Sequence, residues 1–152
     1  MKKVVRLFSV CIIIMFGFYA LQAQTYSGMA KEILSYINEH RERMGLQPLK
    51  MNDAISHVAE IHSKEMAKGI VPFGHTGYDE RMERIAYQIG EANASAENVA
   101  EGASTAKAVV NMWLHSPPHR KNMEGHYNLT GIGIAESNDG SLYFTQIFIH
   151  KQ

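Results

Sequence analysis

Cysteine is almost absent from this sequence of 152 residues, because Cys11 is the only one. A single cysteine excludes a disulfide framework and a four-cysteine zinc site. An excess of charge of one sign is absent too, since 15 lysines and arginines balance 15 aspartates and glutamates. Proteins that bind nucleic acid need a basic surface, so we expect no nucleic-acid partner. Zinc-helix, phosphate-loop and serine-elbow motifs are also missing.

The first 23 residues have the plan of a secretory signal peptide. A basic start precedes an uncharged apolar run over residues 7–21, and small or polar residues follow it. The run is shorter than the roughly 20 residues of a membrane-spanning helix. We expect cleavage after Ala23 and a secreted, periplasmic or cell-envelope location; an uncleaved membrane anchor is the alternative. Residues 24–152 then form a single, mildly acidic domain without cysteine, which packing alone has to hold together.

Hydrophobic periodicity changes along the chain from helical to extended. Four helices are predicted, over residues 28–44, 53–68, 79–89 and 105–116. Residues 90–103 are small and typical of a loop, and Pro117 and Pro118 are expected to end the fourth helix in a stiff turn. Alternating apolar residues then predict strands over 130–135 and 142–149, joined by an Asn-Asp-Gly turn. Helices followed by strands indicate an α+β layered domain.

Three short segments carry side chains suited to binding or catalysis. His75 lies in a glycine-flanked loop, Glu97 is a lone acid among small residues, and His119 follows the proline pair beside Arg120. Loops of fixed geometry are where functional sites are often built. Each of these residues, taken alone, is more typical of a structural role.

Seven motifs occur in an order that resembles the CAP superfamily, or SCP domain, of cysteine-rich secretory proteins, antigen 5 and plant pathogenesis-related proteins. The motifs are Ile37-Asn38-Glu39-His40-Arg41, Leu46-x-Pro48-Leu49, Phe73-x-His75, Ala96-Glu97-Asn98-Val99, Trp113-x-x-Ser116-Pro117-x-His119-Arg120-x-Asn122, Thr130-x-Ile132-Gly133 and Tyr143-x-Thr145-Gln146-x-Phe148. The Ser-Pro-x-His-Arg segment and the missing disulfides resemble the bacterial branch. The resemblance covers residues 30–149 and implies a three-layer α-β-α sandwich with a mainly antiparallel central sheet and an open cavity.

The resemblance also implies which residues line that cavity, namely His75, Glu97 and His119. His126 is not the matching histidine, because it lies too close to the Ile132-Gly133 pair. A second acid of the family is replaced by Ser116. Further residues receive rim or structural roles: Ser116, Arg120 and Gln146 at the rim, and Asn38, Arg41, Asn98 and Trp113 in the framework.

Three functions are compatible with this set of residues. The first is a secreted, monomeric, non-catalytic module whose His/Glu-lined cavity binds a lipid, a glycan or a cell-wall or host component. The second is a metal-dependent, peptidase-like hydrolase, in which His75 and His119 hold zinc or another divalent cation and Glu97 acts as general base. The third is a purely structural hydrogen-bond network that positions the loops.

Overall fold

The structure is a computed structural model, and it describes residues 24–152. The signal-peptide prediction falls on residues 1–23, outside the described residues. A long N-terminal helix covers residues 24–43. The remaining elements are β1 (Lys50–Met51), α2 (Asp53–Ala67), α3 (Tyr78–Ile89), β2 (Ala94–Glu101), α4 (Ala106–His115), α5 (Pro117–Met123), β3 (Leu129–Glu136) and β4 (Leu142–His150). None of the helices in residues 24–152 is long and apolar enough to cross a membrane.

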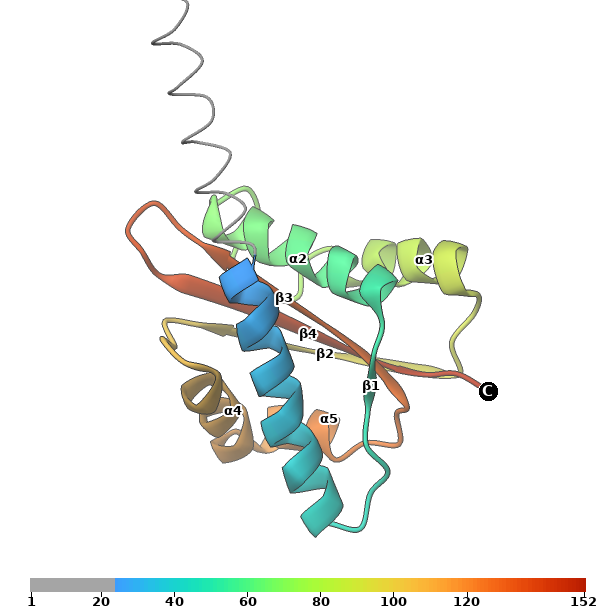
Figure 1. The fold of residues 1–152 in the computed structure, drawn as a ribbon. Coiled ribbons are helices and arrows are strands. Elements are labelled where there is room, and N and C mark those ends of the chain that lie inside the picture. Colours follow the sequence, from blue (N-terminus) through green and yellow to red (C-terminus); the bar gives the residue numbers. More distant parts are fainter. Residues whose placement is uncertain (1–23) are drawn as a thin grey trace, which may run out of the picture.

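The strands form one sheet in the order β1-β3-β4-β2. β4 pairs antiparallel with both β2 and β3, whereas β1 adds a parallel pairing of only two residues to β3. Helices α2 and α3 cover one face, and the N-terminal helix, α4 and α5 cover the other (Figure 1). The α+β prediction is confirmed, and the sheet is mixed through the short parallel strand.

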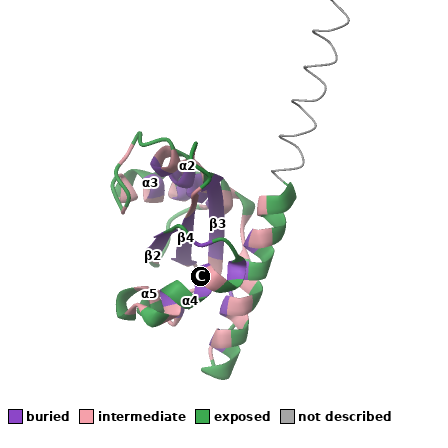
Figure 2. Ribbon diagram, turned by 90° about the vertical axis from the view of Figure 1, so that its left-hand side faces the viewer, coloured by how far each residue is buried: buried purple, intermediate pink, exposed green. Residues whose placement is uncertain are grey.

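The central strand β4 is buried on both faces, which explains its almost unbroken apolar sequence. Phe144 and Phe148 face the core beneath the N-terminal helix and α4, where Trp113 also packs. Ile147 and Ile149 face a second core beneath α2 and α3. Figure 2 shows the buried sheet between two helical layers whose outer sides are exposed. The sheet therefore separates two apolar cores.

Helix α2 packs directly on the backbone of β3. A β-carbon at Gly131 would overlap the backbone of Ile55, and one at Gly133 would overlap the backbone of Glu60. Only glycine fits at these two positions, so the glycine alternation in β3 sets how closely helix and sheet approach.

Two predicted elements were wrong. Residues 94–101, expected within a loop, form the edge strand β2, because eight consecutive residues pair with β4. This pairing outweighs the weak strand preference of alanine, asparagine and glutamate. The turn expected after Ser116 is helix α5. Its prolines occupy the first helical positions, where the missing N–H groups have no helical partner to lose.

Two polar residues of the N-terminal helix fasten it to the loops below. Arg41, only 2% exposed, donates to the carbonyl oxygens of Met123 and Gly125 at 2.7 and 2.9 Å. Its guanidinium also donates to Gln47 and Tyr127, at 2.9 and 3.2 Å. Asn38 exchanges two hydrogen bonds with the backbone of Leu49. The C-terminal end of α5 is thus held in place by the N-terminal helix.

Candidate functional site

A buried ion pair between β2 and α3 forms the centre of the candidate site. Glu97 projects from β2 on the same face as its neighbour Ile147, toward α3. Arg81 reaches it from the first turns of α3 and donates from Nε to Oε2 at 2.8 Å and from Nη2 to Oε1 at 2.7 Å. The Glu97 side chain is 1% exposed. This two-pronged geometry gives the strongest form of arginine–carboxylate hydrogen bonding.

His75 lies above this ion pair. Its Nδ1 is 2.9 Å from Oε1 of Glu97, while the side chain is 52% exposed. A carboxylate only accepts hydrogen bonds, so Nδ1 of His75 carries a proton and donates to Glu97. The same Arg81 donates from Nη1 to the carbonyl oxygen of Thr76 at 2.7 Å, which fixes the loop that presents His75.

His62, from α2, supports the loop from below. Its Nε2 bonds the Gly74 carbonyl oxygen at 2.8 Å, and its Nδ1 lies 3.1 Å from Nη1 of Arg81. Nε2 must therefore donate and Nδ1 accept, which requires a neutral ring. Burial lowers the pKa of His62, the Gly74 hydrogen bond opposes that shift, and the positive charge of Arg81 lowers the pKa further.

His119 approaches the site from the opposite layer, on α5. Asn98 of β2 donates from Nδ2 to the His119 carbonyl oxygen at 3.1 Å, and Asn122 bonds the Asn98 side chain at 2.9 Å and the Glu97 carbonyl oxygen at 3.2 Å. Burial lowers the pKa of His119, and His75 nearby lowers it further. His75 and Glu97 are thus in direct contact, whereas His119 is held next to β2 from the other helical layer through its backbone.

The residues expected at the rim have different positions. Ser116 joins α4 to α5, and Arg120 is exposed on α5 beside an open groove. Gln146 does not reach the site. Strand alternation places it on the sheet face opposite to Glu97, fully buried and bonded to Thr130 Oγ1 at 3.1 Å. Trp113, expected in the framework, is fully buried and donates to the Val99 carbonyl oxygen at 3.2 Å.

The donor set fits a zinc ion poorly. Within residues 24–152, no three histidine, cysteine, aspartate or glutamate side chains are grouped so that they could hold a metal ion. Both oxygens of Glu97 already accept hydrogen bonds from Arg81, and one of them also bonds His75. A metal would have to compete with a buried guanidinium for this carboxylate, leaving only His75 and His119 as ligands.

Sequence reasoning missed Arg81 and His62. Both lie on apolar helix stripes, which is the signal that could have found them. Arg81 precedes the buried Ile85 by one helical turn, and His62 stands one turn from both Val58 and Met66. Polar residues at such positions are buried and need polar partners.

The geometry defines an SCP-type α-β-α domain with a buried Arg–Glu pair that also bonds His75. The profile of the Cysteine-rich secretory protein family (CAP) matches residues 34–148. The chain belongs to this family.

Several of the similar proteins come from bacteria. The chain is 32% identical over 127 residues to the uncharacterized protein YkwD of Bacillus subtilis, covering 82% of this chain and 48% of that protein. An SCP-domain extracellular protein of Bacillus anthracis superposes with a TM-score of 0.69 at 29% identity, over 82% of this chain and 41% of the other. An outer surface protein of Borrelia burgdorferi gives 0.67 at 25% identity, over 80% and 92%. The chain spans about half or less of its curated relatives' length.

Proposed function

We propose that the chain is an extracytoplasmic, non-catalytic binding module, and that His75 and His119 recognise a carbohydrate of the cell envelope. The observation that carries this proposal is that both carboxylate oxygens of Glu97 already accept hydrogen bonds from Arg81. A general base needs a carboxylate oxygen that can reach the substrate. Here Arg81 bonds both oxygens and the side chain is 1% exposed, so the carboxylate orients its neighbours instead.

An exposed aromatic ring close to His75 in the sequence supports a sugar ligand. Phe73 lies two residues before His75, is 52% exposed, and contacts Tyr143 edge-on with ring centroids 6.4 Å apart. An exposed aromatic ring can stack on the C–H face of a sugar. Neutral imidazoles both donate and accept, which suits hydroxyl groups. An extracytoplasmic location is supported by the leader-like residues 1–23 and by the descriptions of the Bacillus anthracis and Borrelia proteins.

Titration with soluble peptidoglycan fragments, followed by NMR of the imidazole signals, tests the ligand. We expect the signals of His75 and His119 to shift, and His75→Ala or Phe73→Ala to weaken binding about tenfold, the equivalent of 1.4 kcal/mol. His126→Ala is the matched control, because His126 is exposed and its ring packs edge-on against the ring of His150. Absence of shifts, or shifts with lipid vesicles instead, would overturn the carbohydrate assignment.

Three further readouts test the other parts of the proposal. Chromatography of the fragments after prolonged incubation should show no cleavage; a new product would contradict the non-catalytic role. If His75→Ala lowers the melting temperature and no ligand binds, the cluster is structural only. Cell fractionation with mass spectrometry of the N-terminus should find the protein outside the cytoplasm and beginning at Gln24; a purely cytoplasmic protein would contradict the location.

A further inference from the structure

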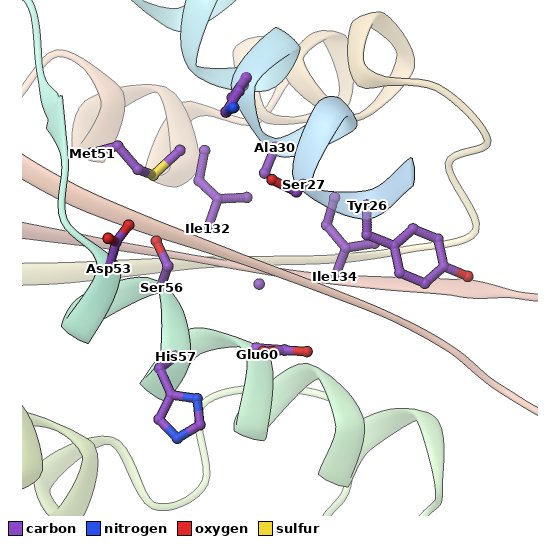
Figure 3. Close-up of a pocket in the computed structure, with 12 residues that line it drawn as sticks. Tyr26, Ser27, Ala30, Met51, Asp53, Ser56, His57, Glu60, Ile132 and Ile134 are labelled. Carbon is purple, nitrogen blue, oxygen red and sulfur yellow. The ribbon is translucent and has the colours of Figure 1, made fainter. Parts of the chain in front are cut away.

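A groove of about 340 Å³ lies between the N-terminal helix and α2, toward the edge of the sheet opposite to β2. Figure 3 shows the N-terminal helix on one side of it, α2 on the other and β3 between them. Ile132 and Ile134 contribute to its floor. The groove thus follows the side of β3 that faces away from β4.

Within residues 24–152, this side of β3 has almost no partner strand. β1 pairs only with Leu129 and Thr130, and the N–H of Asn52 donates to the Thr130 carbonyl oxygen at 2.8 Å. The backbone groups of Thr130 therefore point outward, away from β4. Because backbone direction alternates along a strand, those of Ile132 and Ile134 point the same way, beyond the end of β1. Such an edge offers N–H donors and C=O acceptors in the spacing of another strand.

We propose that this edge groove binds an extended peptide segment of a partner protein, which adds to β3 as a further strand. Main-chain hydrogen bonds to Ile132 and Ile134 would provide affinity, as in other cases of strand addition. The site is separate from the surface around His75, and the proposal is independent of the carbohydrate ligand.

The two walls of the groove specify the side chains of the peptide. Side chains of a strand point alternately to opposite faces, so every second residue would meet the same wall. The N-terminal helix presents Ala30 next to the isoleucines, with Lys31 nearby, whereas α2 presents Asp53 and Glu60. Apolar side chains of the peptide suit the wall formed by the N-terminal helix. Basic side chains suit the α2 wall, because its acids attract them and Lys31 lies on the other wall. The Glu60–Lys64 ion pair is exposed and weak enough to exchange.

The first test uses a fluorescein-labelled hexapeptide of alternating valine and lysine, whose binding to the purified protein is measured by fluorescence anisotropy. We expect a peptide of alternating valine and glutamate to bind about tenfold more weakly. N-methylation of the four central residues should abolish binding, because it removes donors on both edges of the peptide. Equal affinity for the methylated and unmethylated peptides, or no binding of either, would overturn the proposal.

Charge reversal in the protein provides the second test. In the double variant Asp53→Lys/Glu60→Lys, we expect the preference to switch to the valine–glutamate peptide. Asp79→Lys/Glu83→Lys is the matched control, because it changes a first-turn acid and an exposed mid-helix acid of α3 in the same way. Unchanged preference in the first variant, or a switch in the control, would refute the role of the α2 wall. Hydrogen exchange of the Ile132 and Ile134 amides should slow when the valine–lysine peptide binds; unchanged exchange would place it elsewhere.

Discussion

Removal of Arg81 should destabilise the fold more than any other single change at the site. The Glu97 side chain is 1% exposed and depends on Arg81 for two of its hydrogen bonds. Arg81→Met would leave this carboxylate buried with only His75 beside it. Loss of one partner of a buried ion pair costs about 3–5 kcal/mol. For a domain of this size, that corresponds to a fall in melting temperature of about 6–20 °C.

The assay is urea denaturation followed by the fluorescence of Trp113, the only tryptophan and a fully buried one. Arg84→Met is the matched control, because Arg84 is exposed on the same helix and should change stability by less than about 0.5 kcal/mol. The double variant Arg81→Met/Glu97→Gln should recover part of the loss, since no unpaired charge stays buried. A cost below about 1 kcal/mol for Arg81→Met, or strictly additive single changes, would refute the reasoning.

Three other changes have defined outcomes. Gly133→Ala should lower the free energy of unfolding, measured by urea denaturation, by at least about 1–3 kcal/mol, because the added β-carbon overlaps α2. Gly28→Ala on the N-terminal helix has open space around it and should not destabilise the fold; equal effects of the two changes would contradict the close approach of α2 to β3. The lowered pKa values of His62 and His119 mean that these rings leave stability unchanged only well above pH 6.5, where both are neutral in the folded and the unfolded state. Stability should fall as the pH drops through 6.5 and below, because the unfolded rings then take up protons first; His62→Gln should reduce this fall, and an unchanged pH profile would argue against the neutral His62. If the site bound zinc with a micromolar Kd, a hundredfold excess of zinc over that Kd would stabilise the fold by about 2.7 kcal/mol. Because the donor set fits zinc poorly, we expect no shift in melting temperature relative to an EDTA control. A shift that is lost in His75→Ala would contradict this expectation.

The amino-acid sequence predicted the long helices and the β3–β4 hairpin, because their apolar periodicity is produced by local packing on one core. It did not predict β2, whose residues have little strand preference and form a strand only through pairing with a β4 that lies more than 40 positions away. The proline pair was misinterpreted for a related reason. Pro117 follows the end of α4 and also begins α5, and only the conformation of the residues after it shows whether a proline ends one helix or begins the next.

For the candidate site, the motifs named candidate residues but not the hydrogen bonds that connect them. His75 and Glu97 bond each other from a loop and a strand, whereas His119 lies on a helix of the other layer. Arg81 carries no motif, although it fixes both Glu97 and the His75 loop. Gln146 was misplaced because its strand face depends on the register with β2 and β3, which the sequence of β4 alone does not contain.

Arg41 has a further consequence for how the protein matures. It joins the N-terminal helix to the chain between α5 and β3 through hydrogen bonds to carbonyl oxygens, in a part of the sequence that has no cysteine. Such a fastening forms and breaks reversibly during folding, and it requires no oxidant or disulfide isomerase. The domain can therefore fold in the same way on the reducing and the oxidising side of a membrane.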